Sequence, residues 1–136
     1  MQRIRSRAQF QAVMAGPPVA KTAHFALHRA SLAGLQGDRP LFPAADAWLG
    51  VVLPKRWARR AVTRNTLRRQ IYEAARAVAP GLPVAAWVVR LRSEFSRQQF
   101  VSATSEPLKR AARAELQQLL GRVVVKAPAP EVRDVG

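Results

Sequence analysis

The sequence predicts an α+β fold in which helices pack against a small β-sheet. Segments with the apolar spacing of helices alternate with short apolar or alternating runs that are typical of strands. The chain has 136 residues, of which 49% are hydrophobic, and this suffices for one domain with a buried core. We predict the order α-β-β-(β)-α-β-α within a single domain over residues 1–120, followed by a disordered tail over 121–136.

The first predicted helix covers residues 7–15. Ser6 can cap its start, and Phe10, Val13 and Met14 form an apolar stripe on one side. A Gly-Pro-Pro run follows and ends the helix. The same stretch is arginine-rich, free of acids and amphipathic, so a mitochondrial targeting segment is the alternative, although a folded helix accounts for the same pattern.

The segment KTAHFALHRA, residues 21–30, alternates in the manner of a half-buried strand. His24, Ala26 and His28 face one way, and Phe25 and Leu27 face the other. One of these faces is therefore expected in the core, while the other is available for contacts.

Two further strands flank a long helix. Residues 31–46 are rich in proline and glycine and predict a loop, with room for the short bracketed strand. AWLGVVLP (47–54) is the next strand, and a helix follows over about 59–78. VAAWVVRL (84–91) is apolar on both faces, as interior strands are. This order predicts a parallel β-α-β crossover.

A last helix is predicted over 106–120. Ser105 can cap its start, and Pro107 suits its first turn. Its apolar stripe consists of Leu108, Ala112, Leu116, Leu119 and Leu120. The residues after this helix contain prolines and no helical pattern, which is why we expect the tail to be disordered.

The charge balance points to a polyanionic partner. Lys and Arg number 23 against 8 Asp and Glu, so the formal net charge is +15, and nucleic acid is the leading candidate. Most of these cations are arginine, whose planar guanidinium suits phosphate oxygens and base edges. The absence of cysteine excludes disulfides, thiolate metal sites and a cysteine nucleophile. The longest apolar runs are far shorter than the ~20 residues that span a bilayer, so we expect a soluble protein.

The helix over 59–78 has two contrasting sides. A buried stripe is predicted for Leu67, Ile71, Ala74 and Val78. Within about 100° on the opposite side lie Asn65, Arg68, Arg69, Tyr72 and Arg76. A solvated face is the ordinary explanation for a charge run. However, seven basic residues and no acid occur from Lys55 to Arg69, which favours contacts with nucleic-acid phosphates.

Three side chains near this basic face could contact bases. Asn65 offers a donor and an acceptor to a base or ribose, or it could cap the helix. Tyr72 could stack on an unpaired base. Trp57, just ahead of the helix, could stack in the same way or belong to the core.

The chain shows no catalytic pattern of its own. His24 and His28 would lie about 13 Å apart along a strand, at about 3.3 Å per residue, which is too far to share a metal ion. The acids are scattered along the sequence, and glycine-rich phosphate loops are absent. We therefore expect neither catalytic nor metal-ligating residues on this protein.

The stretch LGVVLPKRWARRAVTRNTLRRQIYEAAR, residues 49–76, resembles the protein component of bacterial ribonuclease P. In that family a glycine-containing strand leads to Lys-Lys or Lys-Arg, then Ala-Val, Arg-Asn, two more basic residues and a Glu, with the same spacing. AQFQAVMAG, HFALHR and VAAWVVRL are similar to the family's first helix, first strand and later strand. The likeness covers about residues 3–120, and its central motif is the specific part.

The resemblance implies an α/β sandwich with a left-handed β-α-β crossover that presents the arginine-asparagine helix to a catalytic RNA. It implies a subunit of a tRNA-processing endonuclease that removes the 5′ leader of precursor tRNA. The chemistry would take place on the RNA, with Mg²⁺ held mainly by the RNA. We expect a cytoplasmic protein whose partners are the catalytic RNA and the precursor tRNA leader, with no membrane partner.

The resemblance implies that an RNA-facing motif consists of Arg60, Arg64, Asn65, Arg68 and Arg69, and it places the basic Lys55 and Arg56 near the leader cleft. With the other residues of the basic run and of the polar helix face, the full predicted RNA-binding set is Lys55, Arg56, Arg59, Arg60, Arg64, Asn65, Arg68, Arg69 and Tyr72. The cleft for the single-stranded leader, between the first helix and the sheet, contains Phe10, Met14, Phe25 and His28. The family commonly has Lys where Arg68 stands and Arg where Tyr72 stands. The alternative function is a non-catalytic general or ribosome-associated RNA-binding protein, which charge alone would support.

Overall fold

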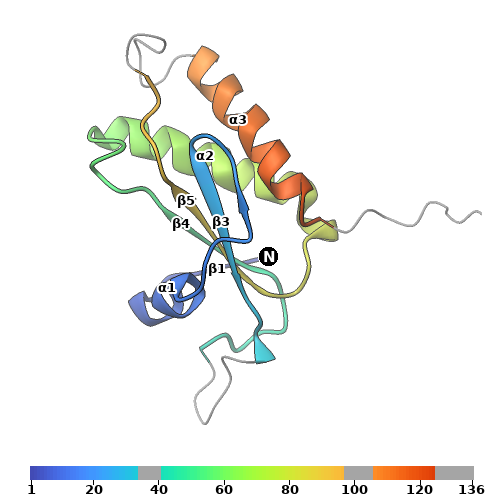
Figure 1. The fold of residues 1–136 in the computed structure, drawn as a ribbon. Coiled ribbons are helices and arrows are strands. Elements are labelled where there is room, and N and C mark those ends of the chain that lie inside the picture. The colour runs from blue at the N-terminus through green and yellow to red at the C-terminus, as the bar shows by residue number, and fades with distance from the viewer. Residues whose placement is uncertain (34–40, 97–105, 125–136) are drawn as a thin grey trace, which may run out of the picture.

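The computed structural model describes residues 1–33, 41–96 and 106–124 (Figure 1). Its strands are β1 (Gln2–Arg3), β2 (Ala20–Lys21), β3 (Phe25–Ala30), β4 (Trp48–Val52) and β5 (Ala86–Leu91). Its helices are α1 (Arg7–Met14), α2 (Ala61–Val78), the 3₁₀ turn η2 (Ala79–Gly81) and α3 (Glu106–Gly121). The α+β class is confirmed, and so are the three predicted helices, with ends within two residues of the predicted ones.

The strands form one mixed sheet in the order β1-β4-β5-β3-β2. β4 and β5 are parallel neighbours joined through α2, which confirms the predicted β-α-β crossover. β3 runs antiparallel to β5 on the other side. The hand of the crossover stays a prediction from the family resemblance.

The strand predicted over 21–30 is in fact a hairpin. Residues 20–21 form β2, and the chain turns at Thr22–His24 to pair antiparallel with β3. The Thr22 backbone N–H donates to the carbonyl of Phe25 over 2.9 Å, and this closes the turn. The two-residue edge strands β1 and β2 were missed because such short segments show no periodicity. In the described part of 31–46 there is no extra strand.

Helices α2 and α3 cover one face of the sheet (Figure 1). The sheet contributes alternate side chains to this core, as the two-residue period of strands requires. These include Phe25, Leu27, Leu49, Trp87, Val89 and Leu91. From the helices, the predicted stripes enter the same cluster through Leu67, Ile71, Leu108 and Leu116, among others. Both stripes are therefore confirmed.

Helix α1 lies on the opposite face of the sheet, over a smaller cluster that contains Ile4, Val13, Phe42, Trp48 and Val88. Ser6 caps α1 as predicted, because its hydroxyl accepts from the Gln9 backbone N–H over 3.1 Å. Strand β1 and helix α1 are both part of the folded domain. The amphipathic pattern of residues 1–14 is therefore explained by folded structure.

Residues 121–124 extend the described domain into the segment predicted as a tail. The Arg122 guanidinium donates to the carbonyl of Lys21 over 2.7 Å, and Val123 and Val124 pack against the α2–α3 core. The rest of the predicted tail lies outside the described residues.

Candidate nucleic-acid interface

A basic surface surrounds the N-terminal half of α2 and the turn before it. We call it the α2 basic surface and define it by Lys55, Arg56, Arg59, Arg60, Arg64, Asn65, Arg68 and Arg69. All of these are exposed except Arg64, which is half-buried. The buried stripe of α2 points the other way, so the helix separates core and cations as its sequence predicts.

The start of α2 adds to this positive potential. Its N-cap is Arg60, which makes no side-chain capping bond, and its first turn contains no acid. The backbone N–H groups of a first helical turn carry a partial positive charge that favours anions. Consequently, cationic side chains and the helix terminus act in the same direction at one end of α2.

Arg64 holds the turn that leads into α2. Its Nη1 donates to the carbonyl oxygens of Ala58 and Arg59, each over 2.9 Å. These bonds fix the backbone that carries Arg59 and Arg60. Arg64 therefore has a structural role besides its predicted contact with RNA, and sequence spacing contained no sign of it.

Asn65 does not cap the helix, because it lies within the first turns and Arg60 is the N-cap residue. Its Oδ1 accepts from Arg68 Nη1 over 3.2 Å. The bond occupies the amide acceptor and directs the guanidinium, while the amide donor stays exposed with the rest of the side chain. Asn65 and Arg68 thus form one polar unit on the α2 basic surface.

Tyr72 is a correction to the predicted RNA-binding set. It is only 7% exposed and packs in the α2–α3 core, with the Arg3 guanidinium 4.0 Å above its ring centroid. Arg3 belongs to β1, which lies far from α2 in the sequence, so helical geometry alone could not predict this contact. Trp57 is half-buried against the same core, which favours its alternative interpretation as a core residue.

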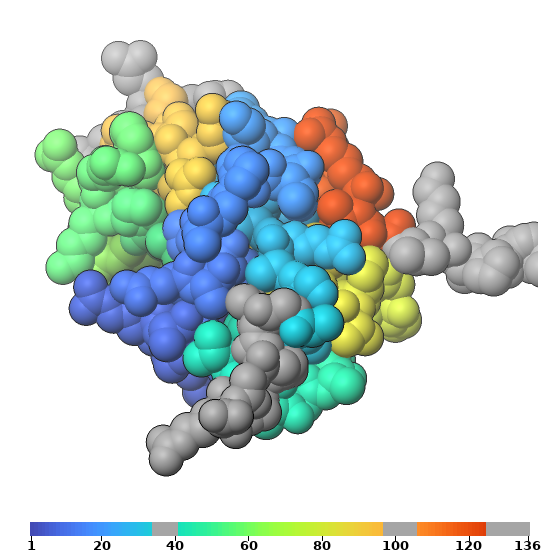
Figure 2. All heavy atoms as spheres, turned by 60° about the horizontal axis from the view of Figure 1, so that its bottom comes forward, coloured from blue at the N-terminus to red at the C-terminus, as the bar shows by residue number. Residues whose placement is uncertain are grey.

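The leader cleft was predicted on the side of the sheet that α1 covers. Figure 2 shows this side, with α1 in dark blue beside the lighter blue β2–β3 segment. Phe10 and Met14 are half-buried here and pack on the smaller cluster. Phe10 lies directly over Gly50: a Cβ at Gly50 would be 2.5 Å from Phe10 Cε1. A side chain at position 50 would therefore force the Phe10 ring to move, and the glycine in β4 allows this ring to pack directly on the sheet.

His28 is on this side but is not available for stacking, which corrects its predicted role. It is 4% exposed, and its Nδ1 lies 3.2 Å from the Gly16 carbonyl oxygen. Since a carbonyl only accepts, Nδ1 carries the proton, and the lone pair of Nε2 accepts from Arg90 Nε over 3.3 Å. Burial lowers the pKa of His28 and is the largest influence on it, so the neutral form is favoured.

Arg90 is a residue that the sequence interpretation missed. It lies on β5 between Ala26 of β3 and Val52 of β4, and it is half-exposed. Its terminal guanidinium nitrogens form no hydrogen bond or ion pair with another described residue, since only Nε is engaged by His28. The signal was present, because Arg90 is the one charge in the otherwise apolar run VAAWVVRL.

Phe25 does not belong to the predicted cleft. Its side chain is fully buried in the α2–α3 core, on the face of the sheet opposite to His28. Strand alternation places residues 25 and 28 on different faces, because they are separated by an odd number of positions.

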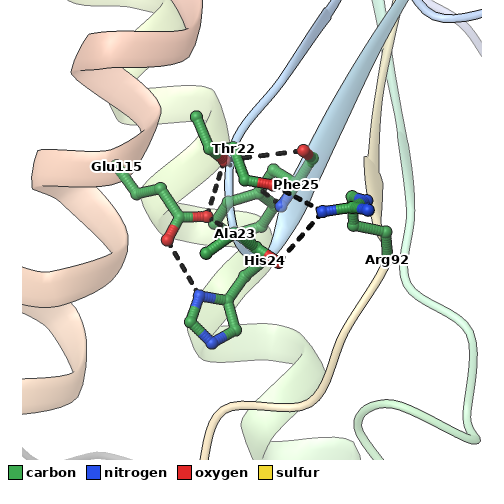
Figure 3. A network of polar contacts seen from close by, with 6 residues as sticks. All are labelled: Thr22, Ala23, His24, Phe25, Arg92 and Glu115. Atoms are coloured by element: carbon green, nitrogen blue, oxygen red, sulfur yellow. Dashed lines mark hydrogen bonds and ion pairs between the residues drawn. The ribbon is translucent and has the colours of Figure 1, made fainter.

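The two histidines take separate structural roles, and the fold brings a carboxylate to His24. Glu115 of α3 accepts from the Thr22 hydroxyl and from the His24 backbone N–H, each over 2.7 Å, and its other oxygen lies 2.8 Å from His24 Nδ1 (Figure 3). Arg92 donates to the Thr22 carbonyl over 2.8 Å. This network ties the β2–β3 turn to α3. Across the described residues, no group of three or more His, Asp or Glu could hold a metal ion.

Comparisons with known proteins show the family of this chain. The family model Ribonuclease P matches residues 1–123. The chain is 40% identical over 121 residues to the ribonuclease P protein component of Bordetella parapertussis, covering 89% of this chain and 90% of that protein. It is 38% identical over 118 residues to the same component of Ralstonia pickettii, covering 86% and 75%.

Solved structures share the fold. The RNase P protein of Thermotoga maritima superposes with a TM-score of 0.63 at 21% identity, covering 90% of this chain and 98% of that one. The Staphylococcus aureus RNase P protein gives a TM-score of 0.60 at 21% identity, covering 90% and 92%. In the described part of the chain, no helix is long and apolar enough to cross a bilayer. From its matched length and its relatives, this chain belongs to the ribonuclease P protein component family.

Proposed function

We propose that this protein is the subunit that assists a catalytic RNA in the endonucleolytic removal of the 5′ leader from precursor tRNA. The observation that carries the proposal is the α2 basic surface, which gathers seven cations and Asn65 at one end of one helix, in a chain of the ribonuclease P family. A surface of this density needs a polyanion to screen it.

The α2 basic surface is the proposed contact with the catalytic RNA. Its exposed guanidinium groups suit phosphate oxygens, and binding through them releases counterions. Each phosphate contact should contribute about 0.7–0.9 to the slope of log affinity against log salt. Steep salt dependence is therefore expected for assembly with the RNA.

The α1 side of the sheet is the proposed contact with the leader. Phe10 and Met14 supply apolar surface on which unpaired bases can pack, and Arg90 supplies a cation for the backbone. Compared with the leader-binding set predicted from the sequence, the proposed contact contains Arg90 and no longer contains Phe25. His28 positions Arg90 in this proposal and does not stack on a base. Contacts of this kind recognise a single strand with little sequence selectivity.

The hydrolytic chemistry is assigned to the RNA. The described carboxylates and histidines do not group into a ligand set for a divalent cation, so they do not fit a protein-held Mg²⁺ site. Mg²⁺ bound by the RNA would supply the activation of water and the stabilisation of the leaving oxygen. This chain would contribute binding and orientation of both RNA partners in the cytoplasm.

Reconstitution tests the proposal. Cleavage of precursor tRNA at the 5′ end of the mature sequence should require this protein, the ribonuclease P RNA and Mg²⁺ together at physiological salt. Arg68→Ala should weaken assembly by about 1–2 kcal/mol, while Arg76→Ala, which removes an exposed arginine from the far end of α2, should change it little. Equal losses for the two variants would show that net charge, and not this surface, binds the RNA.

Two further outcomes separate the alternatives. Metal-dependent cleavage by the protein without RNA would contradict the assignment of chemistry to the RNA. Equal affinity for ribosomal RNA and ribonuclease P RNA would favour the general or ribosome-associated RNA-binding protein. Phe10→Ala should leave assembly with the catalytic RNA intact, because Phe10 lies on the opposite side of the sheet from α2.

A further inference from the structure

A groove lies along α2 and is bounded on its other side by Lys109 of α3. Its volume is about 440 Å³, which falls in the range of about 300–1,000 Å³ typical of small-ligand sites. It is lined by Val62, Asn65, Thr66, Arg69, Gln70, Glu73 and Lys109. Figure 1 shows the two helices side by side over the same face of the sheet. Asn65 and Arg69 belong both to this groove and to the α2 basic surface, so the two regions are continuous.

Gln70 is the unusual residue of this groove. It is 8% exposed, and its side-chain amide forms no hydrogen bond with any other described residue. The neighbouring polar groups are engaged: the Thr66 hydroxyl donates to the Val62 carbonyl over 2.9 Å, and Glu73 accepts from Arg113 over 2.6 Å. Among the described residues, Arg113 Nε is the only fully enclosed side-chain nitrogen or oxygen without a partner, so the Gln70 amide stays reachable from the groove. A ligand that enters the groove can therefore pair with this amide.

The charges around the groove favour an anionic ligand. Its only lining acid, Glu73, is paired with Arg113, while Arg69 is exposed at one wall. Lys109 lies on the other wall and pairs with Glu106, whose side chain is 71% exposed. A surface pair of this kind contributes little and can be exchanged for a phosphate.

We propose that the α2–α3 groove receives one unpaired nucleotide of the catalytic RNA. The Gln70 amide, with one donor and one acceptor side, pairs with the edge of the base, and Arg69 and Lys109 contact the phosphates on either side. This inference rests on the proposed function, because the strand enters from the α2 basic surface. It assigns α3 a contact with RNA that the arginine-asparagine motif does not include.

The test compares two substitutions of Gln by Leu in the full chain assembled with ribonuclease P RNA. Gln70→Leu keeps the side-chain volume but removes the amide. It should weaken assembly about tenfold, which corresponds to roughly 1.4 kcal/mol. The free protein should be equally stable or more stable, because a mostly buried residue whose amide has no partner among the described residues is replaced by an apolar residue of similar volume. Gln118→Leu, on an exposed position of α3, is the matched control and should change neither quantity.

A merely structural role for Gln70 predicts the opposite pattern, in which stability falls and affinity follows it. Unchanged affinity for Gln70→Leu, with Arg68→Ala still harmful, would overturn the groove assignment and leave the proposed function intact. If Arg68→Ala also left the affinity for ribonuclease P RNA unchanged, the proposed function itself would be overturned.

Site-directed crosslinking identifies the occupant. The chain has no cysteine, so Lys109→Cys carries a photo-crosslinker at a unique position, and Gln118→Cys is its control. Lys109→Cys should crosslink to one unpaired nucleotide of the catalytic RNA, and the added Gln70→Leu substitution should reduce the yield. Crosslinks to precursor tRNA, or crosslinks scattered over the RNA as for the control, would contradict the proposal.

Discussion

Replacing Arg90 by glutamine should selectively weaken recognition of the precursor tRNA leader. In the folded chain Arg90 Nε donates to His28 Nε2 over 3.3 Å. The two terminal guanidinium nitrogens form no hydrogen bond with another described residue. A charge-assisted contact of these nitrogens with a phosphate contributes about 1.5–3 kcal/mol when desolvated. Because Arg90 is half-exposed, we discount this to about 1–2 kcal/mol, or roughly a 5- to 30-fold change in affinity.

The assay is a ratio of two affinities measured with the assembled holoenzyme at one salt concentration. Precursor tRNA carries the leader and mature tRNA lacks it, so the ratio isolates the leader contact. Arg90→Gln should lower the ratio by the factor above and leave the affinity for mature tRNA nearly unchanged. His28→Ala should lower the ratio less, because it frees the guanidinium without removing its charge.

Arg29→Gln is the matched control. Arg29 lies on the neighbouring strand β3, but its guanidinium is 5.3 Å from the Trp87 ring centroid on the other face of the sheet. It should leave the ratio unchanged. If Arg90→Gln lowered both affinities equally, Arg90 would act in the fold or at the catalytic RNA, and its assignment to the leader would be refuted.

Three predictions concern stability. Glu115→Ala removes three hydrogen bonds from the β2–β3 turn and should lower the free energy of unfolding, measured by urea titration, by about 2–4 kcal/mol. A loss below about 0.5 kcal/mol would show that the network in Figure 3 contributes little to stability. Gly50→Ala should cost about 1–3 kcal/mol, because the new Cβ overlaps Phe10, and Gly121→Ala, where the space is open, is its control. Burial lowers the folded-state pKa of His28 below 6.5, so the unfolded chain binds more protons as pH falls through that range. Stability should therefore decline from pH 7.5 to pH 5, and His28→Gln should reduce this decline; an unaltered pH profile would contradict the buried neutral imidazole.

Helix periodicity was the most informative part of the sequence. A helix buries whichever side carries its apolar stripe, so Leu67 and Ile71 on one side and Arg68 and Arg69 on the other are separated by local geometry alone. For this reason the three helices, the β-α-β unit and most of the α2 basic surface could be predicted from residue spacing. The motif around Arg64 and Asn65 then indicated the family that the comparisons show.

Tertiary contacts decided what spacing could not. Tyr72 has the helical position of an exposed residue, but β1 brings Arg3 over its ring and buries it. His28 and Arg90 are 62 positions apart and meet only because β3 pairs with β5, which converts a predicted stacking residue into one that orients a cation. Gln70 and Lys109 come together only where α3 packs beside α2.

The sequence by itself determined the fold class, the helices, the basic face of α2 and the family. Each of these features depends on residues that are close in the sequence, because a helix or strand brings regularly spaced neighbours to the same face. Only the tertiary structure decided which candidates are exposed, which are buried, and which polar groups have a partner. Those properties depend on strand pairing and helix packing between residues distant in sequence, as for Glu115 at the β2–β3 turn, and no local pattern encodes them.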